Sequence, residues 1–155
     1  MIDAAGGSDE FADSAADALV QIFGESARKA TATPLAPGHG VYALPELSVK
    51  NFEYRNFARG KRVGRLNTPR LAAVESGGRI VAFFSREDLR GGLVGQPVDG
   101  ILGYAPDTAT DIMRNVLVYA HTGGKGFPPK PKDDPKAKDK AKAKPDDKKP
   151  AAAAR

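Results

Sequence analysis

The 155-residue sequence contains no cysteine and only two histidines. The absence of cysteine excludes disulfide bonds, thiolate nucleophiles and cysteine-ligated metals. No apolar run approaches the roughly 18 residues that are needed to span a bilayer, and the first residues lack the basic and apolar segments of a signal peptide. As written, the sequence therefore predicts a cytoplasmic chain without a transmembrane segment.

The net charge of +5 is distributed unevenly along the chain. From Gly123 onward there are eleven basic and five acidic residues, whereas residues 1–122 hold thirteen basic and fourteen acidic residues. The end of the chain is rich in Lys, Pro and Ala, and such a composition cannot bury enough apolar surface to fold. We expect a folded domain over residues 1–121 and a disordered tail over residues 122–155 that contacts polyanions weakly and without sequence preference.

Apolar residues at helical spacing predict two helices. The first begins at Ser8, a capping residue, and ends near Gly24. The second follows Thr108 and Asp111, which have the spacing of a capping box with Asp in place of Glu. Its expected apolar stripe consists of Ile112, Met113, Val116, Leu117 and Ala120.

Two strands are predicted over residues 71–74 and 79–84, joined by a turn at Gly77 and Gly78. The second strand is apolar on both faces, which is typical of a central strand. A further short strand is suggested by "FEYRNF", residues 52–57. This order of elements favours an α/β layer in which helices cover a small sheet. Because Ile2 and Asp3 leave no room for a strand before the first helix, we expect upstream strands to be missing.

The connection from Ser85 to Asp107 is long for a strand-to-helix link, and long loops in compact domains are often functional. In open α/β sheets such loops lie at the edge where ligands bind, and we expect the turn "DAAGGS", residues 3–8, to meet the loop in the same crevice. We expect Arg86 to donate to an anion or a polar partner group there and Asp88 to orient Arg86. The alternatives are solvated charges between tight turns, or a salt bridge that holds the loop without a ligand. The candidate ligand-binding residues are Asp3, Gly6, Gly7, Ser8, Arg86, Asp88 and Tyr104.

No catalytic motif is present in the sequence. "GGLVG" lacks the Lys-Ser/Thr pair of a phosphate loop, and Ser85 lacks a nucleophile elbow. The spacing of His39, Asp88 and Asp99 is too irregular for a metal site, and no cofactor is indicated. A hydrolase that uses His39 and Asp88 remains an alternative, although a single loop histidine is more often structural.

Five stretches together resemble the C-terminal part of the bacterial domain-of-unknown-function family 4159: "IDAAGGSDEF", "LAPGHGVY", "GGRIVAFFSREDL", "GLVGQPVDGILGY" and "ATDIMRNVLVYA". The resemblance implies a class I glutamine amidotransferase-like fold, a flavodoxin-like α/β sandwich, with further strands before Ile2. It also implies relatives that are exported or membrane-anchored through N-terminal segments.

The catalytic Cys-His-Glu set of true amidotransferases has no counterpart in this sequence, because the chain has no cysteine. We therefore expect a non-catalytic binding or interaction module whose partner is a protein or a small anionic ligand. Two alternatives remain open at this point: the hydrolase described above, and an accessory protein whose tail docks on polyanions.

Overall fold

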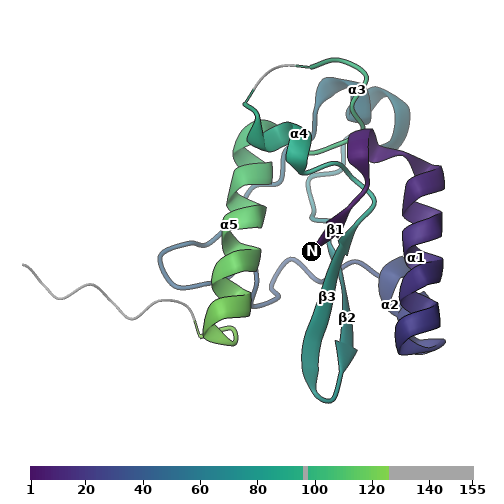
Figure 1. Cartoon of the computed structure of the whole chain (residues 1–155). Helices are drawn as coiled ribbons and strands as arrows, with labels where there is room; N and C mark the ends of the chain where they lie inside the picture. Colours follow the sequence, from purple (N-terminus) through teal and green to yellow (C-terminus); the bar gives the residue numbers. More distant parts are fainter. Residues whose placement is uncertain (96–97, 126–155) are drawn as a thin grey trace, which may run out of the picture.

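The computed structural model describes residues 1–95 and 98–125, so the expected tail lies outside the described residues from position 126 onward. The described chain is mixed α/β, with a three-stranded sheet between helices (Figure 1). The strands are β1 (Ile2–Asp3), β2 (Ala72–Ser76) and β3 (Arg79–Ser85). Their order is β1-β3-β2, with β1 parallel and β2 antiparallel to β3.

The predicted hairpin and the central position of its second strand are both confirmed. Gly77 and Gly78 adopt positive φ angles of 59° and 75°, which glycine tolerates without strain. The register between β2 and β3 shifts at Val74 and Glu75, as in a β-bulge.

The expectation that Ile2 and Asp3 form no strand is wrong. They pair with Phe84 and Ser85, and the amide of Ala4 extends the ladder with a 3.0 Å hydrogen bond to the Ser85 carbonyl. Two residues carry no periodic signal, so this pairing could not be found from local sequence.

One face of the sheet is covered by α1 (Asp9–Phe23) and α2 (Ser26–Ala32), which follow the short helix η1 (Ala5–Gly7). Ser8 caps α1 as predicted, because its hydroxyl accepts the amide of Phe11 at 3.2 Å. The helix ends at Gly24. The core on this face consists of Ala4, Ala12, Leu19, Ala27, Ala72, Val74 and Phe84.

The opposite face is covered by α5 (Pro106–Thr122). Its N-cap is Ala105, and the predicted capping box is wrong because the Thr108 hydroxyl instead accepts the amide of Glu53 at 3.0 Å. Leu117 and Ala120 were expected in the apolar stripe, but both are exposed, Leu117 at 67%. Asn115 is fully buried and donates to the carbonyls of Val41 and Leu47. These two hydrogen bonds tie the irregular segment to the helix and set which helix face is buried.

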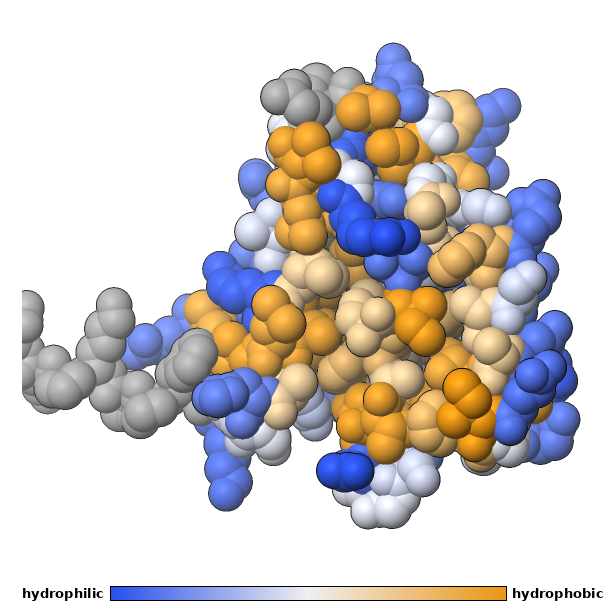
Figure 2. Space-filling view, viewed as in Figure 1, coloured by the Kyte–Doolittle hydropathy of each residue, from blue (hydrophilic) through white to orange (hydrophobic). Residues whose placement is uncertain are grey.

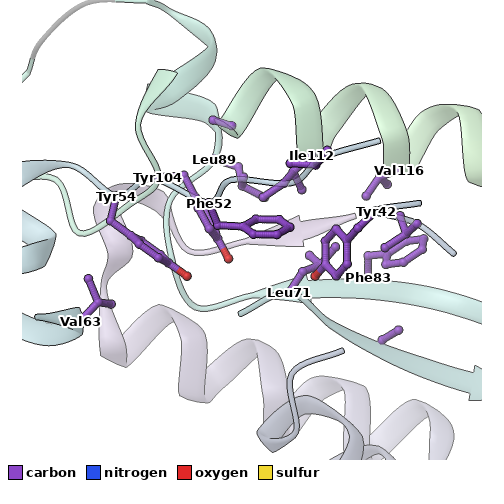
Figure 3. Close-up of a cluster of buried hydrophobic side chains, with 14 of the residues drawn as sticks. Tyr42, Phe52, Tyr54, Val63, Leu71, Phe83, Leu89, Tyr104, Ile112 and Val116 are labelled. Atoms are coloured by element: carbon purple, nitrogen blue, oxygen red, sulfur yellow. The ribbon is translucent and has the colours of Figure 1, made fainter. Parts of the chain in front are cut away.

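Three short helical segments complete the fold: α3 (Asn56–Ala58), the π-helical η2 (Arg59–Val63) and α4 (Arg90–Leu93). The strand predicted over residues 52–57 is reduced to one bridge between Tyr54 and Tyr104, after which α3 begins. The two tyrosine rings stack with centroids 4.6 Å apart (Figure 3). They belong to the larger core cluster, which includes Tyr42, Phe52, Leu71, Phe83, Leu89, Ile112 and Val116.

Candidate functional site

The carboxyl ends of β1 and β3 lie side by side, because Asp3 pairs with Ser85 in a parallel ladder. The turn after β1 and the loop after β3 therefore meet at one edge of the sheet, as predicted. The Asp88 carboxylate bridges them by accepting the amide of Gly6 at 2.8 Å and the amide of Gly91 at 2.6 Å. Asp88 is 4% exposed, so both hydrogen bonds are shielded from water.

Asp3 makes a second connection at this edge. Its carboxylate accepts the amides of Leu89 and Arg90 at 3.2 and 3.3 Å and pairs with the Arg90 guanidinium at 3.1 Å. Charge-assisted hydrogen bonds of this kind are stronger than neutral ones. The two acidic candidates therefore bind the loop of their own chain.

The glycines of the turn have a close neighbour in the same loop. Leu102 donates its amide to the Gly6 carbonyl at 2.9 Å. A Cβ atom at Gly7 would lie 2.2 Å from the Leu102 carbonyl oxygen, and Gly7 has a φ of 76°. Glycine at this position therefore permits the loop to pack on the turn. The place expected for a ligand against Gly7 is filled by residue 102.

Arg86 turns away from Asp88 and pairs with α1. Its guanidinium forms an ion pair with Asp13, and Asp9 lies 3.9 Å away. The expectation that Asp88 orients Arg86 is wrong, because Asp88 is committed to two backbone amides. Arg86 also lines a depression of about 410 Å³ between α1 and α2, together with Asp17 and Arg28.

Tyr104 is fully buried, and its hydroxyl accepts the amide of Arg70 at 2.8 Å. Burial raises the pKa of this hydroxyl well above its ordinary value, and the nearby Tyr54 and Glu87 add to the effect. Tyr104 therefore belongs to the core and presents no hydroxyl to solvent.

Glu87 is a buried carboxylate that the sequence analysis did not single out. It has no exposed surface, and one carboxylate oxygen lies 2.7 Å from Nε of Arg70. Burial raises the pKa of Glu87, and the guanidinium groups of Arg70 and Arg62 offset only part of this effect. The only sequence signal is its place among charged residues directly after an apolar strand, which does not distinguish it from Arg86 or Asp88.

His39 and Asp88 do not come together. Nδ1 of His39 accepts the amide of Val41 at 3.2 Å, and its ring lies against Tyr119 near the end of α5. Asp88 lies beside α4, which packs on the first turns of α5 through Gly92 and Ala109. Tyr119 follows Ala109 by ten positions along α5, which corresponds to a distance of roughly 15 Å along the helix axis. This geometry gives no support to a catalytic pair.

The other prominent feature is the edge of β3 on the side of β1. β1 pairs with Phe84 and Ser85 only, so within the described residues no strand pairs with residues 79–82 on that side. Figure 2 shows a band of hydrophobic surface over this edge, from α5 across β3 towards α1. A cavity of about 420 Å³ lies beside it, lined in part by Ile80, Phe83 and Tyr119.

Comparisons of this chain with protein-family models, with curated proteins and with solved structures find no match. The resemblance to domain-of-unknown-function family 4159 therefore stays a prediction. Within residues 1–95 and 98–125, every helix is too short or too polar to cross a lipid bilayer.

Proposed function

We propose that this chain is a non-catalytic interaction module that binds an extended segment of a partner polypeptide along the open edge of β3. The observation that supports this proposal is the partial coverage of a central strand. β1 pairs with two residues of β3, and the remaining length of β3 faces outward between two helical layers. A free strand edge is a template for pairing with another chain.

The side chains along this edge suit an apolar strand. Ile80 and Phe83 pack with the core on the α5 side, whereas Val81 and Ala82 pack with the core on the α1 side. Alternate side chains of an added strand point to opposite faces of the sheet, so they would extend both cores. Main-chain hydrogen bonds would supply affinity, and the cavity beside Ile80 would supply selectivity for an apolar side chain.

The separation of His39 from Asp88 favours binding over hydrolysis. The internal hydrogen bonds of Asp3 and Asp88 disfavour a small anion at the carboxyl edge of the sheet.

The finer assignment of the fold, a flavodoxin-like sandwich of the amidotransferase type, is part of the same proposal. Its support is the parallel pairing of β1 with β3 and the placement of α1 and α5 on opposite faces.

A short synthetic peptide of alternating valine and threonine, labelled with a fluorophore, provides a direct probe of the edge. We expect its anisotropy to rise with protein concentration. Val81→Lys should weaken binding about tenfold or more, because the added charge lies on the edge. The matched control Val94→Lys, at a position 68% exposed beside α4, should bind like the parent chain. Equal binding by the two variants, with thermal midpoints unchanged, would contradict the proposal.

A further inference from the structure

Residues 55–70 hold six basic residues and no acidic residue, although residues 1–122 as a whole are nearly neutral. They form α3, η2 and the chain that leads to β2, and in Figure 1 α3 lies at the same end of the molecule as α4. This basic segment contains Arg55, Arg59, Lys61, Arg62, Arg65 and Arg70.

Only part of this charge is compensated by carboxylates. Arg70 pairs with Glu87 and Arg62 pairs with Asp9, each at 2.7 Å. Arg59 donates to the carbonyl oxygens of Gly64 and Leu66, which leaves its positive charge in place. Lys61 and Arg65 are exposed, and their side chains form no ion pair or hydrogen bond with any residue that the structure describes.

Two exposed side chains of the segment, Phe57 and Lys61, lie on one face of its helical part. Ala58 and Val63 point into the core, whereas Phe57, Lys61 and Arg65 are exposed at intervals of four residues. Residues four apart are neighbours on a helical surface. Phe57 and Lys61 therefore lie together, with the Phe57 side chain 37% exposed, and Arg65 follows just after the helix.

Gly60 lies on this same face, and the fold does not explain why it is glycine. Its φ is not in the left-handed region, and a Cβ atom there would meet no described atom within 4 Å. Glycine inside a helix costs about 1 kcal/mol relative to alanine. Close approach of an external ligand to the backbone would account for the missing side chain.

We infer that this face binds single-stranded nucleic acid, with phosphates at Lys61 and Arg65 and a base on the ring of Phe57. Proteins that bind single strands combine a basic surface with exposed aromatic rings in this way. A membrane is less suited, because Phe57 is the only large apolar side chain exposed on the segment. This inference concerns a different surface from the open edge of β3 and does not depend on it.

The test uses the full chain and fluorescently labelled oligothymidylate at low salt. Lys61→Ala with Arg65→Ala should weaken binding about fivefold or more. Lys29→Ala with Lys50→Ala removes the same charge from exposed positions elsewhere and should have a much smaller effect. Because the parent chain and both double variants carry the same basic tail, the contribution of the tail to binding is the same in all three and drops out of the comparison. Equal losses in the two double variants would show that diffuse charge or the tail carries the binding, and the inference would fail.

Two further variants separate nucleic acid from other polyanions. Phe57→Ala should weaken the binding of oligothymidylate but leave the binding of inorganic polyphosphate unchanged, because polyphosphate has no base to stack. Gly60→Ala should weaken the binding of oligothymidylate, while its thermal midpoint stays equal to that of the parent chain or rises. The assignment would be overturned if Phe57→Ala lost as much affinity for polyphosphate as for oligothymidylate. It would also be overturned if the parent chain bound phosphatidylserine vesicles but not oligothymidylate.

Discussion

The Asp88 carboxylate accepts the backbone amide of Gly6 across a sequence separation of 82 residues, at 2.8 Å. This contact joins the loop after β3 to the turn after β1. A backbone amide at such a turn is a natural donor to an anion. Here the anion is a side chain of the same chain, so the edge is closed by its own loop.

Replacement of Asp88 by alanine should lower the free energy of unfolding by about 3 kcal/mol, because two amides lose a charged acceptor. Asp99→Ala is the matched control, since Asp99 is exposed and should change stability by less than about 0.5 kcal/mol. Urea unfolding measures both. A change for Asp88→Ala as small as that of the control would show that the loop is not held by this carboxylate.

The two neighbouring glycines of the turn should differ in their tolerance of alanine. Gly6→Ala should cost about 1 to 2 kcal/mol, because only its φ of 64° opposes a side chain. Gly7→Ala should cost about 3 kcal/mol or more, because the new methyl group also collides with Leu102. Thermal denaturation of both variants provides the comparison, and equal midpoints would argue against close packing of Leu102 on the turn.

Glu87 should make stability depend on pH in a defined direction. Its folded-state pKa lies above the ordinary value of 4.5, so the folded state holds the proton more tightly than the unfolded chain. The resulting stabilisation is fully present below about pH 4.5 and is lost as the pH rises through the folded-state pKa. Relative to Glu87→Gln, the parent chain should therefore lose stability on going from acidic to neutral pH. Urea unfolding across this range tests the sign, and parallel profiles would contradict it.

A chain that ends at Lys125 should keep the thermal midpoint of the full chain. Every residue of the two core clusters precedes Gly123, and α5 ends at Thr122. Differential scanning calorimetry of both chains measures the difference. A loss of cooperative unfolding in the shorter chain would show that residues 126–155 contribute to the folded domain.

Local signals in the sequence were sufficient for the hairpin, the cap at Ser8 and the existence of both long helices. They failed where a remote partner decides the local structure. Asn115 is buried because two distant carbonyls need a donor, and Leu117 is exposed as a consequence. The same holds for β1, whose two residues are a strand only because β3 lies beside them.

The candidate site was predicted in part. The meeting of the two loops followed from the rule that parallel strands end at the same edge. The direction of Arg86 could not be predicted, because it depends on where α1 places Asp13. The basic segment was overlooked because the near-neutral charge of residues 1–122 conceals six clustered cations. The exposed face shared by Phe57 and Lys61 is visible only once α3 and η2 are seen as one continuous helical stretch.

Residues 79–82 form the open strand edge that we propose accepts a partner strand. Amide hydrogen exchange followed residue by residue tests it most directly, with and without the valine–threonine peptide. In the free chain, the amides within residues 79–82 that point away from β2 should exchange faster than the amide of Phe84, which pairs with both β1 and β2. The peptide should slow exchange within residues 79–82. Strong protection of all these amides in the free chain, or protection by the peptide only at other sites, would contradict the account.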